Sequence, residues 1–438
     1  MEMAKLPFTQ GVEMEVQVVD EKGRLLQGGR LVRVWDHLMK NAANILQKTV
    51  SKEKGLDFTS KILGVTLKEK ERRGRRLPYV VVSYKTDKGR IDVDVFGPDP
   101  NVSQITWILE LVTPPCESME ELSWWIKTLY KVAFAALPRG YNLISIGFNP
   151  LEEEYRSGVT FGDHYHIGVN DGKEKAAVYN MIRAFIPHLI ALTVNSPFMN
   201  GKPTGVVRVR RRGRTSIIGR DCVRDLRLKY NTGQTGPADK DHYVPYLEEL
   251  NRKTFDETVM REPPDDRYVD VFPFTEYGTI EVRVFDAQFS VARRLAVAAL
   301  LQALALKAVK IVRKGGKIPN VSSATLVENR EKAVLYGLLG KFFPDRGLEK
   351  HDRGFAEKYN INPAGKPNSK LFEAAQGMIE FIREEINELG YWDYLKPVLV
   401  SVYGSSRVEP PCAPADFLLY LYDASASRID RTISHLME

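Results

Sequence analysis

The chain has few cysteines, and none of them lie close together. Only three occur among its 438 residues, namely Cys116, Cys222 and Cys412, and no CxxC spacing is present. Disulfide frameworks and structural zinc sites both need several cysteines at short, regular spacings. We therefore predict neither, and the free thiols suit a reducing interior.

Long uninterrupted apolar runs are also missing. The first ten residues contain no apolar core of the length that a secretory signal needs. The longest apolar stretch, residues 292–312, is interrupted by Arg293, Arg294, Gln302, Lys307 and Lys310. This pattern predicts a buried amphipathic helix rather than a membrane span. We therefore expect a cytoplasmic protein without membrane contact.

A strong excess of one charge is absent as well. Lysine and arginine total 63 against 56 aspartates and glutamates, which gives a net charge of +7 and a pI of about 9.0. This balance is compatible with nucleotide triphosphates, acidic substrates or nucleic acid, but it is too mild to choose among them. With 43% hydrophobic residues, the chain can bury a large core in one large domain or in two to three smaller ones.

What the sequence does contain is a set of predicted strands that carry polar residues on one face. Apolar and polar residues alternate over residues 279–286, which places Glu281 and Arg283 on the same side of a strand. A strand face in contact with water would show the same pattern. The repetition of acids on other predicted strands therefore carries the functional argument.

Acids recur on two other predicted strands. The alternation over residues 11–20 places Glu13 and Glu15 on one face. Glu110 interrupts the nearly continuous apolar run of residues 106–114. An acid in such a run is costly to bury without a partner charge, hydrogen bonds or a metal, so Glu110 is the more informative of these acids.

Two histidines lie on a further predicted strand. His164 and His166 are two residues apart and so share a face, as metal or phosphate ligands could. Carboxylates that converge on one place repel each other unless cations neutralise them or some are protonated. Ligation mostly by oxygen favours Mg²⁺ or Mn²⁺ over zinc, and nearby arginines would suit the phosphates of ATP.

Other charged segments have plainer interpretations. Residues 78–85 and 90–96 have the pattern of a hairpin, in which Asp92 and Asp94 share one face. Acids on hairpins usually face water, so we leave both out of the predicted site. The basic run at residues 68–76 predicts a solvated loop.

A row of arginines follows the turn-rich segment 196–205. If the chain is extended there, one side would carry Arg208, Arg210, Arg212 and Arg214. Such a row could clamp phosphates or carboxylates, bind nucleic acid or face water. No aromatic residue is interleaved with the arginines, which disfavours a nucleic-acid partner. The polar segment 231–266, broken by glycines and prolines, suits a mobile lid or a surface excursion.

Several segments also resemble one known family. In chain order they are GVEME at 11–15, ELVTP at 110–114, HYHIGV at 164–169, SPF at 196–198 with TG at 204–205, and GTIEVRVFDAQ at 278–288. The ordered set, which spans residues 11–304, resembles the carboxylate-amine ligase branch of the glutamate-cysteine ligases. A fainter match continues at residues 328–337.

The resemblance implies an α+β protein with the glutamine synthetase-like catalytic fold, a curved and mostly antiparallel sheet with helices packed on its outer face. Residues 1–438 would form a single catalytic domain, with a sheet-forming core at 1–290 that carries the metal and ATP site and a mostly helical part at 291–438. The implied chemistry is that ATP phosphorylates a carboxylate, typically the side chain of glutamate. An amine such as cysteine then displaces phosphate from the acyl phosphate to form a γ-glutamyl amide.

The resemblance also implies roles for individual residues. The family's metal ligands fall on Glu13, Glu15, Glu110, His164 and Glu281. His166 takes a neighbouring position that would bind the cofactor, and Arg283 and Arg210 would bind the ATP phosphates and act in catalysis. Some relatives carry a further acid where this chain has Ser103, so the number of metal ions stays open.

Three alternative functions are also compatible with the sequence. The acceptor could be a different amine, the acids could serve a metal-dependent phosphohydrolase, or the arginine row could bind RNA or another polyanion. The expected partners are ATP, glutamate, an amine and Mg²⁺ or Mn²⁺. Nucleic acid is disfavoured, and a homo-oligomer is compatible with the sequence.

Overall fold

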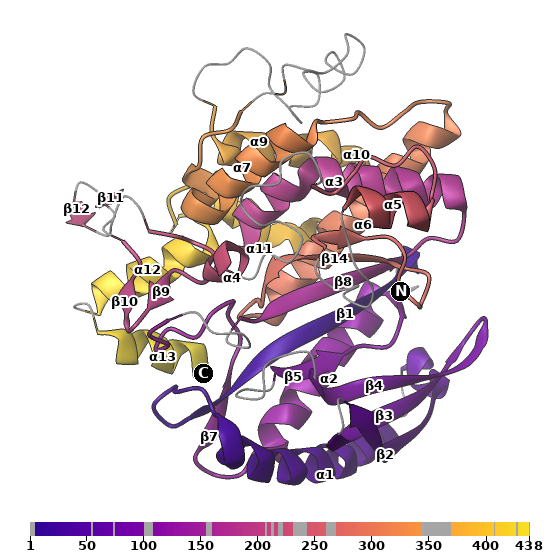
Figure 1. Cartoon of the computed structure of the whole chain (residues 1–438), viewed down its shortest axis with the longest axis vertical. Helices are drawn as coiled ribbons and strands as arrows, with labels where there is room; N and C mark the ends of the chain where they lie inside the picture. The colour runs from indigo at the N-terminus through magenta and orange to yellow at the C-terminus, as the bar shows by residue number, and fades with distance from the viewer. Residues whose placement is uncertain are drawn as a thin grey trace.

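A ten-stranded antiparallel sheet forms the centre of the computed structural model (Figure 1). The structure describes residues 5–53, 56–72, 75–99, 108–154, 160–205, 208–211, 214–217, 222–230, 243–259, 269–343, 345, 369–406, 408–425 and 428–437. Eight strands follow one another in the order β13-β14-β8-β1-β5-β4-β3-β2, and β6 and β7 also pair with β1. Their bounds are β1 (Lys5–Asp20), β2 (Ile62–Arg72), β3 (Arg75–Thr86), β4 (Gly89–Asp99), β5 (Ile108–Val112), β6 (Cys116–Ser118), β7 (Tyr141–Ile144), β8 (Gly162–Gly168), β13 (Val271–Phe272) and β14 (Ile280–Asp286).

Helices pack against this sheet and make up most of the described residues after β14 (Figure 1). The α-helices are α1 (Gly28–Lys52), α2 (Met119–Ala136), α3 (Gly172–Thr193), α4 (Leu226–Tyr230), α5 (Arg252–Thr258), α6 (Val291–Arg313), α7 (Ser323–Tyr336), α9 (Leu371–Phe381), α10 (Arg383–Leu389), α11 (Trp392–Tyr403), α12 (Pro414–Ala424) and α13 (Ile429–Met437). Short 3₁₀ turns are η1 (Asp57–Lys61) and η2 (Gly337–Leu339). The α+β class with a mostly antiparallel sheet is therefore confirmed. The division at residue 290 stays a prediction.

The two faces of the sheet differ because side chains alternate along each strand. On β1, Val12, Met14 and Val16 are fully buried in the main core, and this strand contacts α2 and α6. The hydroxyl of Tyr165 on β8 likewise donates to the Arg294 carbonyl of α6 at 3.1 Å. One face thus packs against helices, which leaves the other face for the polar residues.

Helix α2 begins directly after a serine N-cap. The hydroxyl oxygen of Ser118 accepts a hydrogen bond from the Glu121 backbone N–H at 3.1 Å, as an N-cap does. The Glu121 carboxylate accepts a hydrogen bond from the Glu117 N–H at 2.7 Å. It also accepts a hydrogen bond from the hydroxyl of Tyr84 on β3. This acid therefore ties α2 to the sheet.

The predicted loop at residues 68–76 is wrong. Most of this run belongs to the paired strands β2 and β3. Lys68 and Lys70 lie 2.6 Å from Asp92 and Asp94 on β4, so the acids of the predicted β3–β4 hairpin neutralise them. Two charges of the basic run thus find partners across the sheet.

The arginine row is divided between two strands. Strands β11 (Arg208–Arg211) and β12 (Arg214–Ile217) pair in antiparallel fashion, with Arg211 opposite Arg214. The chain therefore reverses within the row, so the condition of one extended strand is not met. Arg212 lies outside the described residues, as does most of the predicted lid. A second small sheet is formed by β9 (Phe198–Met199) and β10 (Lys202–Pro203).

Two long helices are apolar enough to be compared with membrane spans. Their apolar windows are 100% buried in α3 and 72% buried in α6 inside this fold. They pack against each other, so both serve as core helices here. Burial of the segment predicted at residues 292–312 is thus confirmed.

A histidine inside α3 predicts a pH-dependent stability. His188 is fully buried, its ring centroid lies 5.0 Å from that of Phe185 and 5.3 Å from that of Phe342, and burial lowers its pKa to about 3. An unfolded histidine titrates near pH 6.5, so below that pH only the unfolded state binds the proton. Protonation of His188 in the unfolded state should therefore lower the free energy of unfolding by about 2 kcal/mol as the pH falls from 7 to 5.

We expect His188→Leu to lose less stability on acidification than the wild type does. Urea unfolding at pH 7 and pH 5 measures the difference, and the exposed His37 on α1 supplies the control, His37→Gln. Equal losses in His188→Leu and the wild type would contradict the prediction.

Candidate functional site

Apart from Arg210, the predicted site residues lie on four neighbouring strands, β14, β8, β1 and β5. The register places Glu281 opposite His166 and Glu13 opposite His164. On the next pair of strands, Glu15 lies opposite Glu110. Because these positions alternate with the buried apolar ones, their side chains share the polar face of the sheet.

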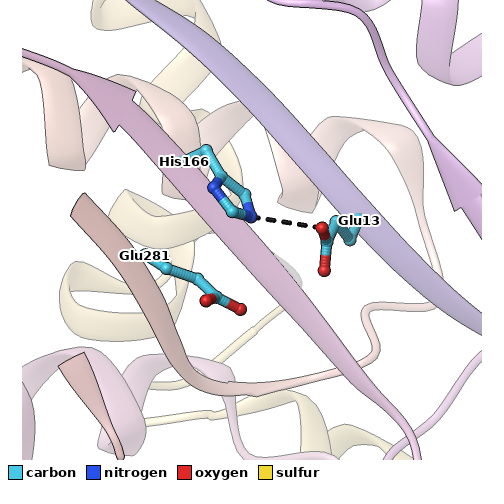
Figure 2. A group of neighbouring side chains, drawn as sticks. All are labelled: Glu13, His166 and Glu281. Carbon is cyan, nitrogen blue, oxygen red and sulfur yellow. Dashed lines mark ion pairs between the residues drawn. The ribbon is translucent and has the colours of Figure 1, made fainter. Parts of the chain in front are cut away.

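Three of these side chains point toward one another from three strands (Figure 2). Glu13, His166 and Glu281 each offer a ligand atom, and the three atoms lie within 4.8 Å of one another. The distance from His166 Nε2 to Glu13 Oε1 is 3.3 Å. We refer to these three residues as the Glu–His–Glu group.

The donor atoms of this group fit a divalent cation. His166 Nδ1 lies 2.8 Å from the Thr279 hydroxyl, which orients the ring. Its buried Nε2 faces Glu13 Oε1 in an ion-pair contact and makes no aligned hydrogen bond among the described residues. Two carboxylates with one imidazole match a site for Mg²⁺ or Mn²⁺, in which this nitrogen would serve as a ligand.

His164 lies beside this group with both nitrogens engaged. Its Nε2 is 3.3 Å from Arg227 Nη2, and because arginine can only donate, Nε2 must accept. The proton is then on Nδ1, which lies 3.4 Å from Glu13 Oε2 and 4.0 Å from Glu281 Oε1. The geometry thus brings His166 into the Glu–His–Glu group in place of His164, whose metal role stays a prediction.

Glu15 and Glu110 are near the Glu–His–Glu group but do not belong to it. The Glu15 carboxylate accepts a hydrogen bond from the Gly162 N–H, and its Oε1 lies 3.9 Å from His164 Nε2. Glu110 is half-buried on β5, directly across from Glu15. Their predicted roles as metal ligands stay predictions.

Electrostatics keep both acids of the Glu–His–Glu group ionised. Burial would raise the pKa of Glu281, but the Arg283 guanidinium, which pairs with it, holds that pKa below its usual value. Burial is likewise outweighed at Glu13, where His166 and His164 hold the pKa well below its usual range. Two ionised carboxylates on one face are the negative centre that a cation requires.

The two histidines respond to the same surroundings in opposite directions. Burial lowers the pKa of His164 to about 4, helped by the charge of Arg283. Burial acts the same way on His166, but the Glu13 carboxylate overcomes it and raises the pKa. At neutral pH, His164 is therefore a neutral ring with a fixed tautomer.

The two predicted arginines lie in different parts of the structure. Arg283 on β14 lies in the site and pairs with Glu281. Arg210 lies on β11, in a hairpin separate from the main sheet (Figure 1), and its side chain is not among those that the structure describes. The role predicted for Arg210 therefore stays a prediction.

One arginine that the sequence analysis did not single out lies in the site. Arg227 is buried and donates to the Arg283 carbonyl at 2.8 Å as well as contacting His164. In the sequence Arg227 lies among other charged residues, namely Arg224, Asp225 and Lys229, so it lacks the apolar run that singled out Glu110.

The fold and this face define the class of protein, an α+β protein with a mostly antiparallel sheet whose polar face carries converging acids and histidines. A family model described as glutamate-cysteine ligase family 2 matches residues 104–348. The chain belongs to glutamate-cysteine ligase family 2.

Curated relatives and a solved structure are similar to the chain. A protein of Gloeobacter violaceus named provisionally as glutamate–cysteine ligase 2 is 27% identical over 56% of this chain. One of Roseiflexus sp. with the same name is 25% identical over 69% of this chain and 76% of its own length. The matches to the Gloeobacter violaceus protein and to a Thermobifida fusca protein of that name span only 58% and 61% of those relatives.

The structural comparison supports the fold. The glutamate–cysteine ligase of Francisella tularensis, solved in complex with AMP, has a TM-score of 0.56 and 13% identity, and the match covers 100% of this chain and 89% of that one. At this identity the likeness shows the shared fold alone.

Proposed function

We propose that the protein is an ATP-dependent ligase that joins the side-chain carboxylate of glutamate to an amine, such as cysteine, with Mg²⁺ or Mn²⁺ as the cofactor. The observation that carries this proposal is the Glu–His–Glu group, whose ligand atoms lie within 4.8 Å of one another beside Arg283. Family membership and the AMP in the Francisella tularensis relative support an adenine nucleotide. A cytoplasmic location and any homo-oligomer stay predictions.

The residues of the Glu–His–Glu group would hold the cation. A bound divalent cation would neutralise the ATP phosphates and the charge that develops during phosphoryl transfer. Arg283 supplies a second positive charge. Burial lowers the pKa of its guanidinium, but Glu281 and Glu13 outweigh this and keep it above the ordinary value, so Arg283 remains protonated and can bind the transferring phosphoryl group.

The reaction then has two steps. A glutamate carboxylate oxygen bonds to the γ-phosphorus of ATP, and the bond from that phosphorus to ADP breaks. The amine nitrogen next bonds to the acyl carbon, phosphate leaves with the carbon–oxygen electron pair, and the nitrogen loses a proton. Water must be excluded, because it would otherwise hydrolyse the acyl phosphate.

An activity assay tests the proposal directly. The protein is incubated with ATP, Mg²⁺, glutamate and a panel of amines, and both released phosphate and new amides are measured. We expect phosphate release that requires both glutamate and an amine, with one amide formed per phosphate. ATP cleavage that is indifferent to glutamate and amines would instead indicate a phosphohydrolase, and absence of turnover with every amine would count against a ligase.

A further inference from the structure

A buried arginine beside the Glu–His–Glu group carries a donor that nothing in the described chain uses. Arg227 is only 6% exposed, and no carboxylate among the described residues forms an ion pair with it. Its Nη2 is engaged by the Arg283 carbonyl at 2.8 Å and by His164 Nε2 at 3.3 Å. Its Nη1 is buried and has no hydrogen-bond partner among those residues.

The local backbone is shaped to admit this guanidinium. Gly162 begins strand β8, and a Cβ placed there would lie 2.5 Å from Arg227 Nη2, so a larger residue would displace the arginine. The N–H of the same Gly162 donates to the Glu15 carboxylate. Arg227 therefore packs directly against the sheet where the predicted metal ligands lie.

The positive charge of Arg227 is held without a direct counter-charge. Arg227 interacts electrostatically with the carboxyl groups of Asp225 and Asp286, both of which are buried. Burial raises the pKa of each carboxyl group, most strongly that of Asp286. Asp286 already accepts from the Asn195 N–H at 2.7 Å and the Ser196 hydroxyl at 2.8 Å. A guanidinium presents a planar fork of N–H donors to an anion, so Arg227 is suited to bind one.

His164 links this cation to the Glu–His–Glu group. Arg227 lies at its Nε2 and Glu13 at its Nδ1, so the imidazole separates the arginine from the carboxylates. A ligand with negative oxygens that bridges a cation at Glu13 and the guanidinium of Arg227 has the charge distribution of a polyphosphate. Guanidinium groups bind phosphate oxygens through their paired N–H groups.

We propose that Arg227 binds a phosphoryl oxygen at the distal end of the ATP triphosphate through its Nη1. This inference rests on the proposed ligase function and adds a second phosphate-binding arginine to Arg283. A buried donor without a partner is costly, and the phosphoryl oxygen supplies the missing acceptor.

Nucleotide binding by Arg227→Gln tests the proposal. Calorimetry with Mg²⁺ compares a non-hydrolysable ATP analogue with AMP, which lacks the distal phosphates. We expect the variant to bind the analogue roughly 10- to 100-fold more weakly and to bind AMP nearly as the wild type does. Arg227→Lys, which retains the charge but not the planar fork, should lose less affinity, and it carries the test if Arg227→Gln does not fold.

Arg224 provides a matched control on the same segment. It is 2% exposed, and its guanidinium donates to the Cys222 carbonyl at 2.6 Å and lies 3.4 Å from Asp416. Arg224→Gln therefore removes an equally buried guanidinium that has its own partners. We expect its triphosphate affinity to match the wild type at a temperature where circular dichroism shows all the proteins folded.

The outcomes separate this inference from the proposed function. Equal weakening of the analogue and AMP in Arg227→Gln would mean that the arginine only maintains the fold of the site. Unchanged affinity for the analogue would mean that Nη1 does not meet a phosphate. Either result overturns the role of Arg227 and leaves the ligase standing, whereas a wild type that binds neither nucleotide overturns both.

Discussion

Glu281→Gln is expected to lose at least roughly 100-fold in turnover while retaining the fold. The substitution removes the charge of one of the two carboxylates that converge with His166, and a neutral amide is a poor ligand for Mg²⁺ or Mn²⁺. The amide oxygen can still accept a hydrogen bond from Arg283, whose guanidinium pairs with Glu281 in the native chain. The backbone of β14 should therefore keep its register.

Three measurements check this result. Amide formation gives the activity, Mn²⁺ calorimetry gives the metal affinity without reference to turnover, and thermal unfolding gives the stability. Glu276 is exposed and lies five positions earlier, so Glu276→Gln makes the same chemical change outside the site and should keep near-normal activity. Near-normal turnover and Mn²⁺ affinity in Glu281→Gln would remove Glu281 from the metal site.

Arg294→Met is expected to destabilise the protein by about 3–5 kcal/mol. Asp163 and Arg294 are 0% and 1% exposed, and Arg294 Nε and Nη2 lie 2.9 Å and 3.0 Å from the two oxygens of Asp163. Burial raises the pKa of Asp163, and Arg294 opposes that effect. Without the arginine, a buried acid next to His164 would lose its counter-charge, although it would still accept from the Gln288 N–H.

Urea unfolding measures this loss. Asp163→Asn combined with Arg294→Met removes both charges, so the double variant should recover part of the stability lost by Arg294→Met alone. Arg383→Met removes one side of an exposed ion pair with Glu380 and should have a much smaller effect. A shift in Arg294→Met no larger than that control would show that the buried pair does not stabilise the fold.

Much of the local structure follows from the order of the residues. Alternation along β1 and β14 predicted that Glu13 and Glu15, and likewise Glu281 and Arg283, share a face, because a strand repeats every two residues. The same reasoning predicted the β3–β4 hairpin, and helical spacing predicted the core segment that became α6. Ordered motifs then led to the family to which the chain belongs.

Side-chain partners across the sheet could not be predicted in this way. Periodicity assigns a residue to a face, but it does not give the register between strands that are distant in the chain. Lys68 and Lys70 are strand residues whose partners, Asp92 and Asp94, lie on another strand of the sheet. The arginine row was divided because the chain reverses between β11 and β12, which no period within the row predicts.

The same limit explains the site. The i, i+2 spacing put His164 and His166 on one face and could not rank them as ligands. Pairing placed His166 opposite Glu281 on one side and opposite Gly11 on the other, so its ring has carboxylates within reach and no side chain directly across on β1. Arg227 entered the site from a segment 63 residues after His164. Strand periodicity thus specified the polar face of the sheet. The three-dimensional packing of distant segments specified which arginine and which histidine meet there.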